Sequence, residues 1–353
     1  MCGWRPSTIF LLACAIGPVV GPHRAAAQPL ERIGPSSPKA AVTNDFDWTD
    51  FIDREHEAIS SRVIGVGRGL DALLSKPFRD PQAKQRDKGR VDKFISDRKL
   101  EEDSKGSRLK VVPRLDWYDG SDLDPSLKFR GKLRLPRLQD RVDLIFSSED
   151  EEEEVAGNPI GLPATRTASE RQGTAGLRYY LKETANFRSS VDAALRFNPE
   201  PEPRLRLRLR AYHDFEPLTT RFVQSFYWKG EGGFGEKSQF DLEKQKRFHY
   251  LRRLSTAVLL AEDSDGVEAS ETLSLYKYLS GRRVVGVELG VSGVLDPARV
   301  DNSQFSLVYR KRVHRDWMFL ELQPGVEFPR ERGFEATAFM EIRLEIIFGD
   351  WDA

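Results

Sequence analysis

The chain of 353 residues contains almost no cysteine: Cys2 and Cys14 are the only two, and both lie in its first segment. Beyond that segment, disulfides, thiolate metal sites and a cysteine nucleophile are therefore excluded. The sequence also lacks any run of about 18 apolar residues, which excludes an ordinary membrane-spanning helix. A membrane β-barrel is still allowed, because only every second residue of its strands must face lipid.

An excess of charge of either sign is absent as well. The chain carries 55 basic and 55 acidic residues, so its net charge gives no indication of a nucleic-acid partner. The mean hydropathy of −0.51 is that of a water-soluble protein. Any membrane segment must therefore be found from its pattern.

The first 27 residues differ from the rest and have the features of an export signal. Arg5 provides a basic start, Ile9–Val20 is mostly apolar, and alanines occupy positions 25–27, which a signal peptidase recognises. We predict a signal peptide at residues 1–27 and export. The alternative is cleavage before Cys14, because the preceding Leu11-Leu12-Ala13 resembles a lipobox, and Cys14 would then be a lipidation site.

Residues 28–106 form a predicted periplasmic N-terminal segment. Within it, 28–47 is a tether, 76–106 is a charged linker, and 48–75 has the apolar spacing of an amphipathic helix. Gly65, Gly67 and Gly69 are expected to weaken the second half of this helix. Its apolar stripe needs a cover, so we expect it to lie along the barrel mouth, to enter the lumen as a plug, or to bind a periplasmic protein.

From Ser107 onwards, polar and apolar residues alternate. Residues 204–211 are the clearest case, since arginines occupy the even positions and apolar residues the odd ones. Only a strand sorts side chains with period two. Residues 127–135 repeat this pattern with lysine and arginine.

Fourteen such segments predict an all-β antiparallel transmembrane barrel at 107–349, with a range of 12–16 strands, preceded by the periplasmic helix. The segments are 107–117, 126–135, 140–147, 174–183, 187–197, 204–214, 218–229, 235–244, 249–261, 267–279, 283–294, 301–312, 317–328 and 336–348. The third is short and the eighth is weakly patterned. The longest connection, 148–173, falls on the side opposite the termini, as in outer-membrane barrels.

A secreted soluble β-protein is the alternative, because period two alone does not separate it from a membrane barrel. Three features favour the membrane: the export signal, the strand length, and aromatic residues near strand ends, where lipid-boundary girdles occur. These aromatics are Trp117, Tyr118, Trp228, Trp317, Phe328 and Phe348.

The leader, the alternation and the last strand together resemble Gram-negative outer-membrane β-barrels. The apolar row of that strand ends at the aromatic Phe348, which resembles the assembly signal of these barrels, and Trp351 is a second candidate. The resemblance implies an outer-membrane location, with membrane lipid, lipopolysaccharide and the barrel-assembly machinery as partners. It points to no single named transporter or enzyme.

The sequence contains no recognisable catalytic set. His56, His213, His249 and His314 lack metal-ligand spacing, and we predict neither enzymatic activity nor a cofactor. His213 and His249 are expected to be surface or girdle residues. The glycines at 230–235 are expected to form a hairpin loop, because a strand follows them.

One run of carboxylates falls in the longest predicted outer loop. A solvated loop is the plain interpretation, and binding of calcium or magnesium is the sharper one, since hard cations prefer several oxygen ligands. The residues are Glu149, Asp150, Glu151, Glu152, Glu153 and Glu154.

Two basic rows are the main candidate functional residues. On lipid-facing positions each cation would cost about 2–4 kcal/mol at mid-bilayer, so we expect both rows inside the lumen. They are Lys128, Arg130, Lys132, Arg134, Arg204, Arg206, Arg208 and Arg210. Expected counter-charges are Asp143, Asp192, Glu288, Glu321, Glu327, Glu341 and Glu345.

The basic rows allow two functions. They could form ion pairs that hold the wall rigid, or a strip that attracts anions through a pore. The sequence thus favours a pore or transport barrel. The alternative is a non-conducting structural or assembly barrel that docks a periplasmic partner through residues 48–75.

Overall fold

The computed structural model describes residues 48–74, 106–135, 138, 141–148, 173–184, 186–198, 200–215, 218–246, 250–262, 264, 266–280 and 282–349. The predicted signal peptide, tether and charged linker lie outside these residues. So do His249, Trp351 and the carboxylate run Glu149–Glu154. These expectations stay predictions.

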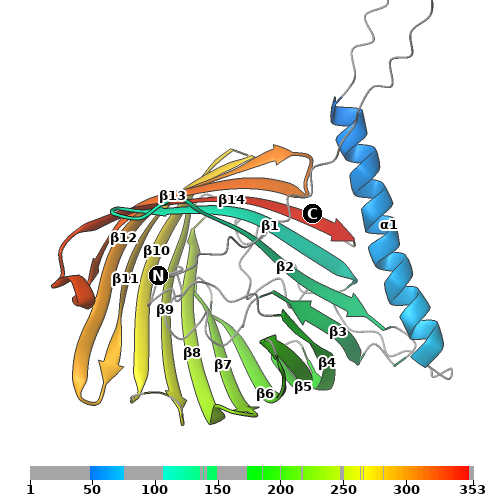
Figure 1. Ribbon diagram of the computed structural model, residues 1–353, viewed down its shortest axis with the longest axis horizontal. Helices are drawn as coiled ribbons and strands as arrows, with labels where there is room; N and C mark the ends of the chain where they lie inside the picture. The colour runs from blue at the N-terminus through cyan, green and yellow to red at the C-terminus, as the bar shows by residue number, and fades with distance from the viewer. Residues whose placement is uncertain are drawn as a thin grey trace, which may run out of the picture. The chain divides into compact units, whose positions relative to one another are not determined.

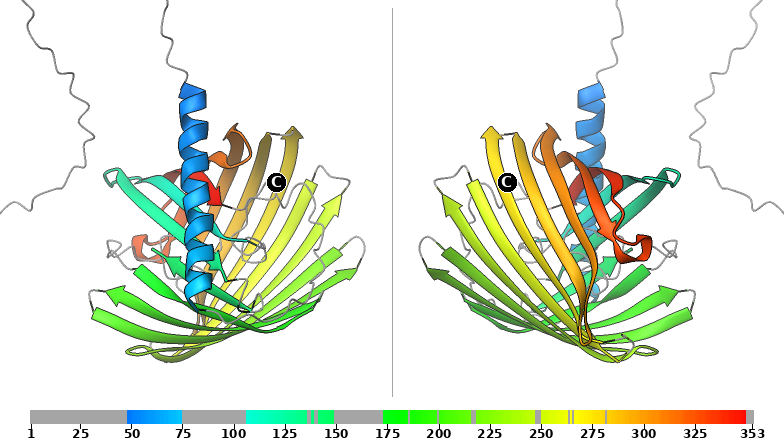
Figure 2. Two further views of the ribbon diagram at one scale, coloured as in Figure 1. Left: turned by 90° about the vertical axis from the view of Figure 1, so that its right-hand side faces the viewer. Right: turned by 90° about the vertical axis from the view of Figure 1, so that its left-hand side faces the viewer.

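The described strands form one closed antiparallel barrel (Figures 1 and 2), in which each pairs with its sequence neighbours and the last pairs with the first. Closure pairs the backbone of every strand on both sides, as a bilayer interior demands. The strands are β1 Arg108–Tyr118, β2 Asp124–Arg134, β3 Val142–Ser147, β4 Gly173–Glu183, β5 Phe187–Asn198, β6 Glu200–Phe215, β7 Leu218–Lys229, β8 Gly233–Lys246, β9 Tyr250–Ala261, β10 Glu268–Ser280, β11 Arg283–Leu295, β12 Ala298–His314, β13 Met318–Pro329 and β14 Thr337–Gly349.

The prediction of a barrel of about fourteen strands is confirmed. Each predicted segment corresponds to one strand, and β3 is the short one, as expected. The glycines at 230–235 lie at the hairpin between β7 and β8, where Gly233 has a φ of 70°.

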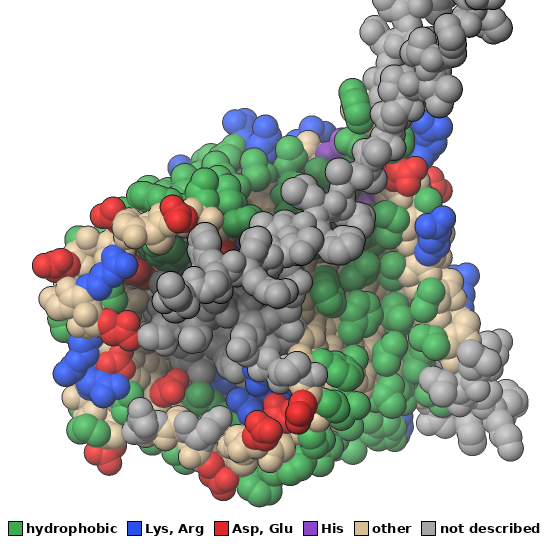
Figure 3. Space-filling view, in the orientation of Figure 1, with side chains coloured by type: hydrophobic (Ala, Val, Ile, Leu, Met, Phe, Trp, Pro, Cys, Tyr) green, Lys and Arg blue, Asp and Glu red, His purple; other side chains and the backbone are tan. Residues whose placement is uncertain are grey.

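The barrel is apolar outside and polar inside, the reverse of a soluble protein. On the outer face Leu127 is 64% exposed and Leu205 is 51% exposed, whereas Arg204 and Arg206, on either side of Leu205 in the same strand, are buried. Figure 3 shows hydrophobic side chains gathered over the visible outer wall. This arrangement matches a wall surrounded by lipid and contradicts the soluble β-protein alternative.

The two ends of the barrel differ. At one end, here called the helix end, β14 ends, β1 begins and short connections join the strands. At the other, the loop end, β3 and β4 are joined by residues 148–172.

The inner wall is not polar throughout. Near the helix end, strands β9 to β14 and the connection between β12 and β13 contribute a buried apolar cluster to the inside. The sequence did not predict it, because each strand supplies only one or two members to an otherwise polar row. The cluster consists of Leu251, Tyr276, Val284, Val308, Trp317, Phe319 and Ile347.

Helix α1, Trp48–Leu74, lies beside β14, β1 and β2 at the helix end. This is the rim position among the three that the sequence allowed. The helix continues through all three glycines, and the weakening expected from them stays a prediction. Gly67 is buried where α1 approaches the barrel, and a Cβ there would lie 2.8 Å from Ser107 Oγ. No helix in the described part of the chain is long and apolar enough to cross a membrane.

Candidate functional site: the inner wall

Strand β6 carries the densest row of cations on the inner wall. Arg204, Arg206, Arg208 and Arg210 are all buried, and Arg210 is only 3% exposed. Leucines at the intervening positions face outward, so the alternation alone turns all four guanidiniums inward. The sequence prediction for the direction of this row is confirmed.

A buried carboxylate joins this row to the neighbouring strands. Asp192 of β5 accepts hydrogen bonds from Arg178 of β4, at 2.8 and 3.0 Å, and from Arg206 of β6, at 2.5 and 3.0 Å. The register explains the pairing, because Asp192 lies directly opposite both arginines. The guanidiniums of Arg178 and Arg206 can both lie next to Asp192 because its carboxylate is between them and offsets their mutual repulsion.

The basic side chains continue onto β7. Arg221 donates to Asp241 of β8 through Nε and Nη2, at 2.9 and 2.7 Å. Gln239 and Ser255 also donate to Asp241, which is fully buried. Arg178 and Arg221 could not be recognised as wall residues from the sequence, because each is a single arginine in its strand rather than part of a row.

The row on β2 is separate from the row on β6. Lys128, Arg130, Lys132 and Arg134 alternate with the exposed Leu127 and Phe129, but β3, β4 and β5 lie between β2 and β6. The two rows of the predicted strip therefore lie on separate parts of the inner wall. Lys132 Nζ lies 3.4 Å from Asp143 Oδ2 of β3, to which the Tyr180 hydroxyl also donates at 2.8 Å.

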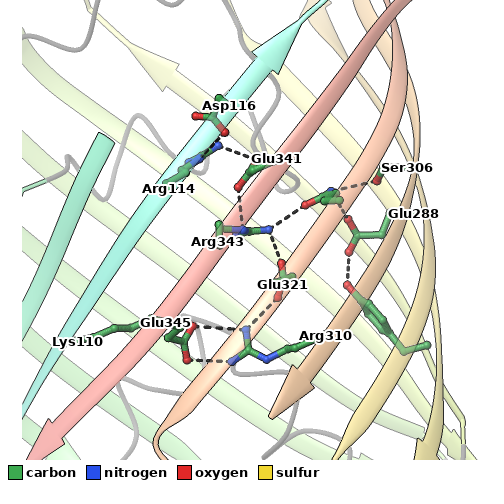
Figure 4. A network of polar contacts seen from close by, with 12 residues as sticks. Lys110, Arg114, Asp116, Glu288, Ser306, Arg310, Glu321, Glu341, Arg343 and Glu345 are labelled. Atoms are coloured by element: carbon green, nitrogen blue, oxygen red, sulfur yellow. Dashed lines mark hydrogen bonds and ion pairs between the residues drawn. The ribbon is translucent and has the colours of Figure 1, made fainter. Parts of the chain in front are cut away.

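A second part of the wall, around the closure of the barrel, has alternating charges (Figure 4). Glu345 of β14 lies between Lys110 of β1, at 2.7 Å, and Arg310 of β12, at 2.9 Å. Arg310 in turn pairs with Glu321 of β13 at 2.9 Å, and Arg343 of β14 reaches the same carboxylate. These pairs connect the last strands of the chain to the first.

The network extends to both sides of Arg343. This arginine lies 2.7 Å from Glu341, which pairs with Arg114 of β1 at 2.7 Å. It also donates to Gln323 at 2.8 Å, and Gln323 donates to Glu288 at 3.2 Å.

Most of the predicted counter-charges take the role expected of them. Asp143, Asp192, Glu321, Glu341 and Glu345 each pair with a cation on another strand. Glu288 differs, because its hydrogen-bond donors are the neutral Tyr276 and Gln323. Glu327 is buried on the inner face as expected.

The inner wall therefore has two sectors. From β4 to β7 the charged side chains are predominantly arginine, with Asp192 among them. From β11 through β14 to β1, carboxylates and cations alternate. An anion inside the barrel would be attracted to the first sector, here called the basic wall.

Helix α1 is attached to the barrel by a group of side chains that we call the helix latch. Asp53 Oδ1 lies 2.7 Å from His314 Nε2, and Asp53 Oδ2 lies 2.7 Å from Arg315 Nη2. Hydrogen bonds from Arg315 and then from His314 lower the pKa of Asp53 below its ordinary 3.8.

The second half of the latch is His56. Its ring stacks on Trp317, with centroids 3.7 Å apart, and its Nε2 lies 2.7 Å from the carbonyl oxygen of Ile347. Because a carbonyl only accepts, Nε2 carries the proton. Phe348 also stacks on His56.

The prediction that Trp317 belongs to the aromatic girdle is thus wrong. It is 9% exposed beneath His56 rather than at the lipid boundary. The latch could not be predicted from the sequence, because Asp53 and His56 are far in sequence from residues 314–317. His213 is exposed, as expected.

The described residues hold no cluster of three or more histidine, cysteine or carboxylate side chains suited to a metal ion. The expected absence of enzymatic activity and of a cofactor stays a prediction. The roles of the basic rows and of Phe348 are also untested.

No protein-family model and no curated protein matches the chain. Similar solved structures include OprB of Pseudomonas putida, at 9% identity over 73% of this chain and 97% of that one, with a TM-score of 0.47. An anion-selective porin from Comamonas acidovorans is 11% identical over 69% and 99%, with a TM-score of 0.40. A loop-deletion mutant of OmpT, an outer membrane protein of Vibrio cholerae, is 11% identical over 69% and 98%, with a TM-score of 0.42.

These similarities are too weak to decide family or function. The fold stands on the chain's own geometry. A closed barrel of fourteen described antiparallel strands, apolar outside and polar inside, is the architecture of Gram-negative outer-membrane β-barrels.

Proposed function

We propose that this protein is an outer-membrane pore whose basic wall favours anions. The observation that carries the proposal is the concentration of inward arginines from β4 to β7. Fixed cations that line a water-filled passage raise the local concentration of anions and lower that of cations. The alternating charges near the closure contribute little net potential, because each carboxylate there lies beside a cation.

The membrane location is part of this proposal and rests on energetics. Turning the wall around would place the arginines of β6 in lipid, at about 2–4 kcal/mol each near mid-bilayer. The exposed leucine and phenylalanine side chains of the outer wall, in contrast, lose water contact when lipid surrounds them.

Planar-bilayer recording tests the proposal. Under a potassium chloride gradient we expect the reversal potential to show chloride preferred over potassium. Arg208→Gln with Arg210→Gln should move the permeability ratio towards one, because two inner-wall charges are lost. Arg54→Gln with Arg62→Gln, on the exposed face of α1, removes the same charge and should leave the ratio unchanged. A cation-selective barrel would contradict the anion preference, and a silent barrel would contradict the pore.

A silent barrel would favour the second candidate, a structural barrel that docks a periplasmic partner through α1. The exposed aromatic pair Trp48 and Phe51, whose rings lie 6.3 Å apart, supports this candidate. Trp48→Ala with Phe51→Ala should then weaken partner binding without altering the barrel.

A further inference from the structure

Five basic side chains form a row on the outer face of the barrel, and the proposed pore does not use them. They lie near the helix end of five consecutive strands, and all are exposed. Their outer-face neighbours towards the middle of the wall are apolar, for example Leu242, Leu254, Leu275 and Val285, and Leu320 lies directly opposite Lys311. The row, which we call the basic belt, consists of Lys244 of β8, Arg252 of β9, Lys277 of β10, Arg283 of β11 and Lys311 of β12.

The strand register makes the belt continuous. Lys244 lies directly opposite Arg252, and Arg283 lies directly opposite Lys311. Lys277 lies between these pairs, where it is diagonal to Arg252 and to Arg283. Like charges directly opposite on one face destabilise a sheet unless an anion neutralises them.

The described part of the protein does not supply that anion. Within the described part of the chain, no carboxylate pairs with any of the five. The nearby Glu243 pairs with Arg253 on the inner face, and Asp316 pairs with Arg312. On the outer face, the acidic residues of these strands lie towards the loop end, at Glu236 and Glu271.

The surroundings of the belt indicate the depth of a lipid headgroup. Lys277 Nζ lies 5.6 Å from the centre of the Tyr250 ring, which is itself exposed. Tyr250 and Leu279 lie beyond the belt on the outer face, so the cations have apolar neighbours on both sides. Lysine and arginine in such positions keep their stems in the apolar zone and extend the charge to the boundary.

We propose that the basic belt binds the phosphates of anionic phospholipids in the leaflet at the helix end of the barrel. Five adjacent cations and no paired carboxylate match a surface of lipid phosphates, and the apolar wall next to them matches the acyl chains. The proposal rests on the membrane location proposed above. It adds a lipid class and the leaflet in which each end of the barrel lies.

The test uses the full-length protein in phosphatidylcholine vesicles with spin-labelled lipids. We expect phosphatidylglycerol to associate with the wild-type barrel about three- to tenfold more strongly than phosphatidylcholine, and the preference to fall with salt. Arg283→Gln with Lys311→Gln should remove at least half of the preference. The double variant Arg62→Gln with Arg68→Gln on α1 loses the same charge and should keep the preference for phosphatidylglycerol. The double variant Lys244→Arg with Lys311→Arg retains the belt charges and should also keep that preference.

Three results would overturn the proposal. The first is a wild-type ratio near one in a barrel that has inserted normally, and the second is an equal loss in the α1 control. The third is a belt-dependent preference for lipid A over phosphatidylglycerol, which would place the helix end in the opposite leaflet. Failure to insert into phosphatidylcholine at all would instead count against the membrane location, so the two failures are distinguishable.

Discussion

At the scale of single residues, buried carboxylates decide whether a charged inner wall is stable. Asp192 is almost completely buried between Arg178 and Arg206. Burying an ion costs several kcal/mol, and only close opposite charges and hydrogen bonds offset that cost. Removing one such carboxylate therefore matters far more than removing one at the surface.

Asp192→Asn should lower the free energy of unfolding by about 3–5 kcal/mol, because two buried guanidiniums would then face each other without a counter-charge. Urea unfolding in detergent measures this change in the free energy of unfolding. Asp301→Asn is the control, since Asp301 pairs with Arg299 at 2.6 Å on the surface and the expected loss is about 0–1 kcal/mol. Equal effects would contradict the role given to Asp192.

Gly67 shows how one residue allows helix and barrel to approach. Gly67→Ala would push Ser107 Oγ, which accepts a hydrogen bond from the Arg134 amide at 3.1 Å. Gly65 has open space around it, so Gly65→Ala should stabilise α1 by about 0.5–1 kcal/mol. Amide hydrogen exchange of α1 should slow in Gly65→Ala and accelerate in Gly67→Ala. Slower exchange in both would show that the close approach does not matter.

At the scale of elements, α1 is attached to the barrel by the latch and the Gly67 approach. The latch couples the helix to the connection between β12 and β13 and to the end of β14. It is polar at Asp53 and stacked at His56, so two kinds of interaction hold one helix.

Acid should release the Asp53 half of the latch. The pKa of Asp53 is lowered in the folded protein, so its stabilisation is present above pH 3.8 and is lost as pH falls from there through the lowered pKa. Spin labels at Glu57→Cys and Val313→Cys should give a narrow distance distribution at pH 7 and pH 5, and a broad one well below pH 3.8.

Asp53→Asn should give the broad distribution already at pH 7 and pH 5, because the amide no longer pairs with Arg315 as an anion does. Glu55→Gln, which removes an exposed carboxylate of the same helix, is the matched control and should leave it narrow. A narrow distribution in Asp53→Asn would show that His56 and Gly67 hold the helix without it.

At the scale of the whole described molecule, the barrel closes without α1. The first and last strands pair directly from Arg108 with Gly349 to Tyr118 with Phe339. The ion pairs around Arg343 and Arg310 join the same seam from inside. The helix lies at the end of this seam and contributes no strand to it.

A variant lacking residues 28–106 should therefore still fold into a barrel. Folded outer-membrane barrels migrate differently in denaturing gels before and after heating, and we expect the truncated chain to keep this shift, with a modestly lower urea midpoint. Loss of the shift would mean that the N-terminal segment is needed for closure.

The sequence alone determined the strands, their approximate ends and the direction of their faces. Period two is a local property, so Arg204 and Leu205 must point to opposite sides whatever the rest of the chain does. The inward direction of the two basic rows on β2 and β6 also follows locally, because lipid would penalise the reverse. Helix α1 could be predicted from its own spacing for the same reason.

Only the tertiary structure decided which side chains meet. Register between strands placed Asp192 beside Arg178 and Arg206, separated the two basic rows, and aligned the basic belt across five strands. The latch joins Asp53 and His56 to residues 314–317 and to the last strand, far along the chain. Such contacts depend on closure and on the position of the helix, neither of which a local pattern contains.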